Sequence, residues 1–215
     1  MLNNKSKIFI FSSCLLLFSV FLISCNSSSN SNAQKKPVAN NSVSEIKKGV
    51  APVADNEIAI VETDYGTIKI ELYSNIAPKM VARFKELAKE DVYKGTSFHR
   101  INDNVIQGGD PFSKDSDPLN DGMGKSDKPN VDAEFSDIPF DTAIVGAARG
   151  GQDVNTANSQ FFIMLKRQPG FDNRYTIFGK VIEGMSNVQT IAGAPREGEK
   201  SSEAIRIKSV SIQPK

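Results

Sequence analysis

The sequence offers few residues that could bind zinc or form a disulfide, because its 215 residues include only one histidine and two cysteines. Zinc sites in proteins are built mainly from histidine and cysteine. Cys14 lies in a segment that we expect to be removed, so Cys25 would be the only cysteine left and no disulfide could form within the mature chain. No serine or cysteine stands in a recognisable nucleophile motif, which argues against a hydrolase. We expect no metal and no cofactor.

The sequence also has little excess of charge of either sign. Its 26 basic and 25 acidic side chains give a formal net charge of +1. Removal of residues 1–24 would take away Lys5 and Lys7 but no acid, which lowers the charge to −1. Proteins that bind nucleic acids through the phosphates need a basic surface. We therefore expect no nucleic-acid partner.

The N-terminal residues have the pattern of a secretion signal. Lys5 and Lys7 precede an uncharged apolar run, residues 8–23. This run is shorter than the roughly 20 apolar residues that a membrane-spanning helix needs. It ends in Leu22-Ile23-Ser24-Cys25, which resembles the bacterial lipobox, a motif whose cysteine is acylated and becomes the first residue. We interpret Cys25 as a lipidation site; the alternatives are an uncleaved anchor or an ordinary cleavage site with an incidental cysteine.

Lipidation would attach the protein to a membrane of the cell envelope, because each buried methylene of an acyl chain contributes about 0.8 kcal/mol. Asn26 is not the aspartate that resembles an inner-membrane retention signal, which favours the outer membrane, facing the periplasm. The following residues are rich in Asn, Ser and Lys and poor in large apolar side chains, which predicts a flexible tether. The predicted organisation is a lipoprotein signal peptide at 1–24, lipidated Cys25 with its tether at 25–56, and one folded domain at 57–215.

Alternation of apolar and polar residues dominates the predicted domain. Residues 57–63 and 67–72 alternate on either side of Asp64-Tyr65-Gly66, which predicts a hairpin. Two stretches have helical spacing instead: one opens at Pro78, and the other covers about 185–192. Many short strands with few helices are typical of a barrel or a sandwich, and the pattern alone leaves both open. Further strands are predicted at 143–146, 160–165, 176–181 and 205–212.

Four segments in fixed order carry the most specific signal. They are Ser97-Phe98-His99-Arg100, Val105-Ile106-Gln107-Gly108-Gly109-Asp110-Pro111, Asn158-Ser159-Gln160-Phe161-Phe162-Ile163 and Tyr175-Thr176-Ile177-Phe178-Gly179-Lys180-Val181. Together they resemble the cyclophilin family of peptidyl-prolyl cis/trans isomerases, from about residue 57 to the end of the chain. The resemblance implies an all-β-dominated fold, a closed eight-stranded antiparallel barrel capped by two α-helices. It also implies that the partners are Xaa-Pro segments of unfolded or exported proteins, and we expect a monomer.

Isomerisation of a prolyl bond needs neither a nucleophile nor a metal. The barrier of about 18–20 kcal/mol comes from resonance between the nitrogen lone pair and the carbonyl. A catalyst therefore needs an apolar pocket for the proline ring and a donor aimed at the prolyl nitrogen. Arg100 matches the catalytic arginine of the family, and its guanidinium could address that nitrogen while contacting Gln107. The resemblance makes Arg100 and Gln107 the catalytic candidates.

Further residues match the positions that hold the peptide. Gln160 offers an amide to the substrate backbone, and Ala148 with Arg149 matches the stretch that binds the peptide. Successive side chains of a strand point to opposite faces, so Phe161 should enter the core and Phe162 the groove. His99, the only histidine, is interpreted as structural or groove-lining rather than as a general base. The complete set of substrate-binding candidates is His99, Val105, Ala148, Arg149, Gln160, Phe162, Phe171 and Tyr175.

The sequence departs from the family pattern at several points, three of which concern the groove. Arg149 adds positive charge beside the groove, and Asn104 falls where an aromatic pocket wall is expected. Gly170 occupies the approximate position of the tryptophan of cyclosporin-sensitive members, which implies weak cyclosporin binding.

Three hypotheses about the function follow from the sequence. The first is a lipid-anchored isomerase that assists the folding of exported proteins, and the second is a non-catalytic chaperone or binding module for proline-containing extended segments. The third is a surface interaction protein that uses the barrel only as a scaffold.

Overall fold

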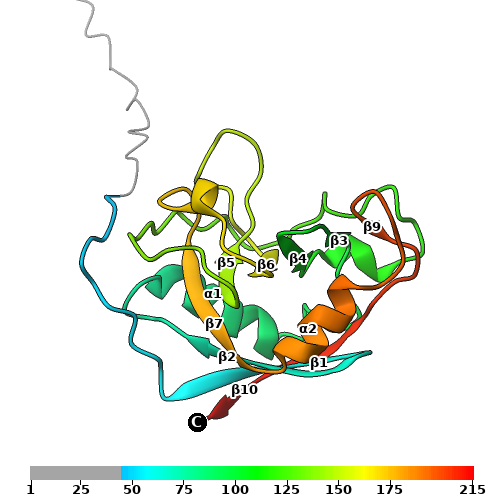
Figure 1. The fold of residues 1–215 in the computed structure, drawn as a ribbon, viewed down its shortest axis with the longest axis horizontal. Helices are drawn as coiled ribbons and strands as arrows, with labels where there is room; N and C mark the ends of the chain where they lie inside the picture. Colours follow the sequence, from blue (N-terminus) through cyan, green and yellow to red (C-terminus); the bar gives the residue numbers. More distant parts are fainter. Residues whose placement is uncertain (1–44) are drawn as a thin grey trace, which may run out of the picture. The chain divides into compact units, whose positions relative to one another are not determined.

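The computed structural model describes residues 45–215. The predicted signal peptide, Cys25 and most of the predicted tether fall within residues 1–44, outside the described residues. From residue 45 onward the chain forms ten strands, two α-helices and two short 3₁₀ helices. Eight of these strands form one antiparallel sheet in the order β10-β1-β2-β7-β5-β6-β4-β3, which curls around the core (Figure 1).

Along the chain, each helix separates one group of strands from the next. The eight strands are β1 (Glu57–Thr63), β2 (Gly66–Leu72), β3 (Arg100–Ile101), β4 (Val105–Gly108), β5 (Ile144–Ala147), β6 (Phe161–Met164), β7 (Ile177–Glu183) and β10 (Ile207–Pro214). A separate hairpin consists of β8 (Arg196–Glu197) and β9 (Lys200–Ser201), and the two 3₁₀ helices are η1 (Pro111–Lys114) and η2 (Pro169–Phe171).

The predicted hairpin at the start of the domain is present as β1 and β2. Thr63 pairs with Gly66 across a two-residue turn. The Thr63 hydroxyl donates to the Gly66 carbonyl over 2.7 Å and accepts from the Tyr65 amide over 3.1 Å. Gly66 has a φ of +107°, which side chains with a Cβ rarely adopt. Local chemistry therefore sets the register of this hairpin.

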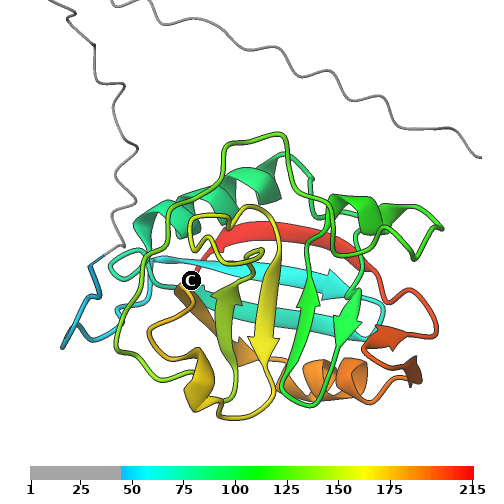
Figure 2. The same cartoon turned by 90° about the horizontal axis from the view of Figure 1, so that it is seen from above.

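The two predicted helices are also present and lie at opposite ends of the curled sheet (Figure 2). Helix α1 (Pro78–Lys89) has a proline in its first turn, where the missing N–H costs nothing, and it buries Phe84 and Leu87. Helix α2 (Met185–Ala192) follows Gly184 and buries Val188 and Ile191. Both helices thus present the apolar stripe that their sequence spacing predicts.

Strand β6 separates the two apolar clusters of the domain. Phe161 is fully buried in the interior cluster, where its ring meets those of Phe84 and Tyr93 edge to face at 5.5 and 5.8 Å between centroids. Phe162 belongs to the other cluster, together with Phe140. The alternation predicted for this strand, with Phe161 in the core and Phe162 on the outer face, is confirmed.

The prediction of a closed barrel is wrong. The sheet is an open half-barrel that curls through 207°, and its edge strands β10 and β3 do not pair as a ladder. Strand β3 is two residues long, and the amide of Ile101 bonds the carbonyl of Glu199 in the β8–β9 hairpin over 2.7 Å. The segment before β3 approaches β10 only at an isolated bridge between Ser97 and Arg206. Because β3 has only two residues, it forms no ladder with β10 and the barrel stays open.

The end of the predicted tether also needs correction, because residues 45–56 lie against the domain. The amide of Lys47 donates to the Phe135 carbonyl over 2.9 Å, and its ammonium donates to the Ile76 carbonyl over 2.7 Å. Asp55 accepts from the Ser74 hydroxyl and from the Lys85 ammonium, each over 2.7 Å. These contacts join residues far apart in sequence, so composition alone could not show them. None of the helices between residue 45 and the C-terminus is long and apolar enough to cross a membrane.

Candidate active site

A hollow of about 70 Å³ opens on the outer face of β4, β5 and β6; we call it the apolar hollow for its aromatic and aliphatic side chains, although two arginines and a glutamine also border it. Every residue that lines it is one of the predicted site residues, although they come from segments between positions 100 and 175. Tertiary folding therefore brings together most of the candidates that the motifs indicated. The lining consists of Arg100, Val105, Gln107, Ala148, Arg149, Phe162, Phe171 and Tyr175.

Aromatic rings form the wall of this apolar hollow. Phe162 meets Phe171 and Tyr175 edge to face, with centroids 5.7 and 5.6 Å apart, and Phe140 packs behind it at 5.9 Å. The Phe162 ring lies over Gly146, its partner on β5; a Cβ there would sit 2.4 Å from the ring. A glycine at 146 is thus what allows Phe162 to occupy this place.

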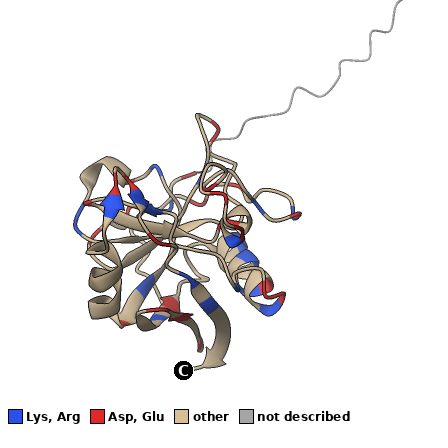
Figure 3. Cartoon of the chain, turned by 90° about the vertical axis from the view of Figure 1, so that its right-hand side faces the viewer, with Lys and Arg blue, Asp and Glu red and all other residues tan. Residues whose placement is uncertain are grey.

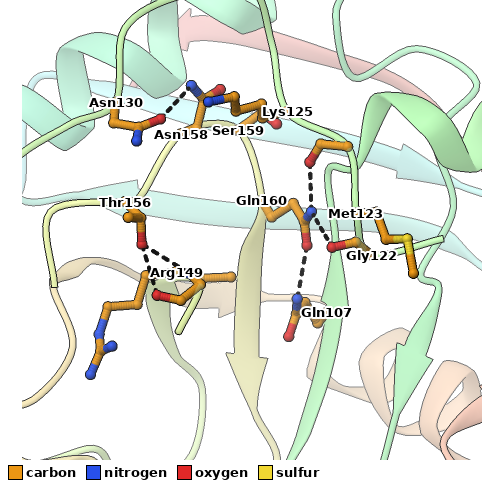
Figure 4. Close-up of a pocket in the computed structure, with 13 residues that line it drawn as sticks. Gln107, Gly122, Met123, Lys125, Asn130, Arg149, Thr156, Asn158, Ser159 and Gln160 are labelled. Atoms are coloured by element: carbon orange, nitrogen blue, oxygen red, sulfur yellow. Dashed lines mark hydrogen bonds between the residues drawn. The ribbon is translucent and has the colours of Figure 1, made fainter. Parts of the chain in front are cut away.

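Three polar side chains beside the apolar hollow are connected by a continuous series of hydrogen bonds. Arg100 and Gln107 are paired residues of β3 and β4, and the Arg100 Nη1 donates to the Gln107 Oε1 over 3.3 Å. The Gln107 amide donates in turn to the Gln160 Oε1 over 2.9 Å. The Gln160 amide ends the series by donating to the carbonyls of Gly122 and Gly124 over 3.0 and 2.7 Å (Figure 4). Each amide therefore has a defined orientation before any peptide binds.

Glu199 is a site residue that sequence reasoning missed. Its carboxylate accepts from the Arg100 Nε over 2.6 Å and from Nη2 over 3.4 Å. Asn102 donates to the same carboxylate over 2.7 Å. These hydrogen bonds, from Arg100 first, lower the pKa of Glu199. Glu199 stands in the β8–β9 turn, 99 residues from Arg100, and no motif marks it.

A second hollow of about 290 Å³, which we call the polar hollow because Gln, Asn, Thr, Ser and Lys residues surround it, adjoins the first and shares Gln107, Ala148 and Arg149 with it. Figure 4 shows the side chains that line it. Asn158, Ser159 and Gln160 in this hollow come from one of the four motifs, whereas much of the remaining wall comes from loops without a regular pattern. The additional lining residues are Gly122, Met123, Gly124, Lys125, Asn130, Gly150, Thr156, Asn158 and Ser159.

His99 lies behind Arg100 rather than in the apolar hollow. It is 7% exposed and borders a third hollow of about 320 Å³, together with Arg100, Asp121 and Glu199. Neither ring nitrogen has a hydrogen-bond partner within the part of the chain that the structure describes. Burial lowers the pKa of His99, an effect that the nearby carboxylates of Asp110 and Asp121 oppose. A buried neutral imidazole fits the structural interpretation better than a role as general base.

Asn104, the expected gap in the aromatic wall, lies in the turn between β3 and β4. Its amide bonds the Asn102 side chain over 2.9 Å and its carbonyl accepts from the Leu165 amide over 2.7 Å. It is not among the residues that line the apolar hollow, whose wall on this side is Val105. The hollow is therefore enclosed without a contribution from position 104.

Comparison with known proteins identifies this arrangement. The family model described as cyclophilin type peptidyl-prolyl cis-trans isomerase/CLD matches residues 58–212. The chain belongs to the cyclophilin family. Its resemblance to that family is thereby confirmed, and we describe it from here on as a cyclophilin and an isomerase of prolyl peptide bonds.

Individual relatives agree with this assignment. A probable peptidyl-prolyl cis-trans isomerase of Brucella suis is 41% identical over 147 residues, which cover 66% of this chain and 74% of the relative. An isomerase of Dictyostelium discoideum is 37% identical over 152 residues, 68% of this chain and 92% of the relative. A Cryptosporidium parvum cyclophilin, crystallised in the presence of the dipeptide Ala-Pro, has a TM-score of 0.67 and 30% identity. That match covers 74% of this chain and 99% of the other.

The structure of this cyclophilin holds a ring-sized apolar hollow beside an oriented arginine. No group of three or more His, Cys, Asp and Glu side chains suited to a metal ion occurs among residues 45–215. The residues that line the apolar hollow offer hydrogen-bond donors, positive charge and aromatic surface. These are the groups that rotation about a peptide bond requires, because the reaction makes and breaks no covalent bond. Cys25 lies outside the described residues, and its lipidation stays a prediction.

Proposed function

We propose that this cyclophilin is a lipid-anchored enzyme of the cell envelope, where it isomerises Xaa-Pro bonds of exported proteins as they fold. The observation that carries the proposal is the combination of an isomerase domain with the N-terminal pattern of Lys5, Lys7, an apolar run and Cys25. The signal directs the chain out of the cytoplasm, and acylated Cys25 holds it at the membrane. We infer the outer membrane, facing the periplasm, from Asn26.

The substrate of such an enzyme is abundant in the envelope. Newly exported chains arrive unfolded, and their Xaa-Pro bonds isomerise in tens to hundreds of seconds without a catalyst, which is slow enough to limit folding. An isomerase fixed at the membrane acts on these chains while their proline segments are still exposed.

Our proposal for catalysis assigns one task to each part of the site. The apolar hollow with Phe162 at its base takes the proline ring. The Arg100 guanidinium donates to the prolyl nitrogen as the bond twists and the lone pair leaves its resonance. Gln107 holds the Nη1 end of Arg100 while Gln160 and Ala148 contact the peptide backbone. Arg100 then interacts more strongly with the twisted amide than with the planar one, which is the condition for a faster reaction.

The lipid anchor is tested by replacing Cys25 with serine in the full chain. We expect the variant to lose its acyl chains and to move from the membrane fraction to the soluble fraction, as measured by fractionation and mass spectrometry of the N-terminal peptide. Cys14→Ser is the matched control, because Cys14 lies within the apolar run and should not affect anchoring. Lipid on the Cys25→Ser protein, or membrane attachment equal to the wild type, would show that the anchor is elsewhere.

A further inference from the structure

Arg149 occupies the junction of the three hollows described above. It lines the apolar hollow, the polar hollow and the third hollow beside His99. Its guanidinium carbon lies 4.7 Å from the centroid of the Tyr175 ring, a cation–π contact that holds the group against the aromatic wall. A residue beside a proline in the apolar hollow would therefore meet Arg149 on entering either of the other two hollows.

The charge of Arg149 is not neutralised by a neighbouring carboxylate. Its Nε donates to the Arg174 carbonyl over 3.3 Å and its Nη1 to the Gly151 carbonyl over 3.0 Å. None of the ion pairs formed within residues 45–215 includes Arg149. Its Nη2 has no acceptor in the same part of the chain. The group is thus held by two carbonyls and a ring, and one of its nitrogens is free to bind a ligand.

The charge of Arg100, unlike that of Arg149, is already neutralised by an ion pair with Glu199. Basic and acidic residues are interspersed over the strands, helices and loops of the domain (Figure 3). Neither the apolar nor the polar hollow is lined by an aspartate or glutamate, and the polar hollow has two cations, Arg149 and Lys125, that form no ion pair within residues 45–215. The third hollow contains Asp121 and Glu199 as well as cations. An acidic side chain therefore finds its least opposed position in the polar hollow, against Arg149.

We propose that Arg149 selects substrates with an acidic residue directly beside the proline. A carboxylate there would accept a charge-assisted hydrogen bond from the free Nη2. A lysine in the same place would meet two like charges. The inference rests on the function proposed above, since it concerns the peptide that the isomerase turns over, and it adds the chemical class of the favoured substrate.

The test compares tetrapeptides that differ in one residue next to the proline. Glu, Gln and Lys are placed before the proline in one series and after it in a second, and kcat/KM is measured for each with a protease-free NMR exchange assay. In at least one series we expect Glu to exceed Lys by about threefold to tenfold at low salt, with Gln between them. Added salt should reduce this ratio, because the pair is partly exposed.

Variants then assign the preference to Arg149. Arg149→Gln should bring the ratio of Glu to Lys close to one, and Arg149→Lys should keep its direction. Arg174→Gln is the matched control: it removes a neighbouring exposed cation that lines none of the three hollows, so it should leave the ratio unchanged. The ratio is taken within each protein, which makes it independent of any general loss of activity.

Two results would overturn the proposal: a wild-type ratio near one in both series, or a ratio that survives in Arg149→Gln. Failure of the proposed function itself would look different, because the neutral Gln peptides would also not be turned over. Peptide affinities measured by NMR titration in the same samples would then decide the charge preference without any turnover.

Discussion

Phe161 and Phe162 are neighbours on one strand, yet they belong to different parts of the molecule. Phe161 packs among rings that are themselves fully buried, Phe84 and Tyr93 among them. Phe162 meets Phe171 and Tyr175, which are only half-buried because they border the apolar hollow. The inner cluster has every side of its rings covered, whereas the outer cluster leaves a space of about 70 Å³.

This difference shows how one strand serves both stability and function. Burial of apolar surface stabilises the fold in both clusters, but only the outer one leaves surface that a ligand can still cover. A bound proline ring would cover the apolar surface that the outer cluster leaves exposed, whereas folding alone covers the surface of the inner cluster. Substitutions on the two faces of β6 should therefore separate effects on unfolding from effects on turnover.

Phe161→Ala should have the largest effect, and it should act on stability. Removing a fully buried ring leaves a cavity, and we expect the free energy of unfolding to fall by about 3–5 kcal/mol. Denaturant unfolding followed by circular dichroism measures the loss. A variant about as stable as the wild type would mean that the inner cluster does not hold the fold together.

Arg100→Ala should produce the largest effect on turnover with little change in unfolding. Loss of a donor that acts on the twisted bond typically lowers kcat by about 100-fold to 1,000-fold. Arg100→Lys should recover little, because an ammonium lacks the fork that Gln107 and Glu199 hold. An alanine variant with near wild-type isomerisation of a proline tetrapeptide would show that another residue is catalytic.

Phe162→Ala should combine a moderate loss of activity with a loss of stability smaller than that of Phe161→Ala. The ring provides apolar contact to the proline, and removing it should lower kcat/KM by about 10-fold to 100-fold. Water can enter the space from the open hollow, which limits the cost to folding. Equal destabilisation by the two substitutions would contradict the distinction between the two faces.

Glu199→Ala should reduce kcat by about fivefold and leave KM nearly unchanged, because it releases one edge of the Arg100 guanidinium without touching the apolar wall. Glu199→Gln keeps an acceptor oxygen and should retain more activity. Glu197→Ala, on the adjacent strand β8, is the control for general effects on the hairpin. If kcat did not change, the orientation of Arg100 would depend on Gln107 alone.

The smallest effect concerns pH and His99. Because burial lowers its pKa in the folded protein, the unfolded chain binds a proton more readily as the pH falls below about 6.5. The wild type should therefore lose stability progressively below that pH, whereas above it the contribution is fully present. His99→Leu should flatten the dependence measured by denaturant unfolding between about pH 7.5 and pH 5.5. Identical slopes would place His99 in a less buried environment than the structure shows.

Most of the local structure could be predicted, because its causes are local. The β1–β2 hairpin follows from the alternation on both sides of Asp64-Tyr65-Gly66, and α2 occupies the range that its apolar spacing indicates. The resemblance to the cyclophilin family was sufficient to name every residue that lines the apolar hollow, including three that lie outside the four motifs. The β8–β9 hairpin was not predicted, since its strands of two residues are too short to show any period.

The sequence by itself determined which faces of the strands and helices are apolar, and therefore that Phe161 enters the core while Phe162 faces the groove. Those patterns repeat over two to four residues and do not depend on distant parts of the chain. Only the tertiary structure decided that the sheet stays open, that residues 45–56 lie against the domain, and that Glu199 pairs with Arg100 while Arg149 has no carboxylate partner. Each of these depends on where segments many residues apart meet in space, and electrostatic and hydrogen-bond partners are set by that distance rather than by separation along the chain.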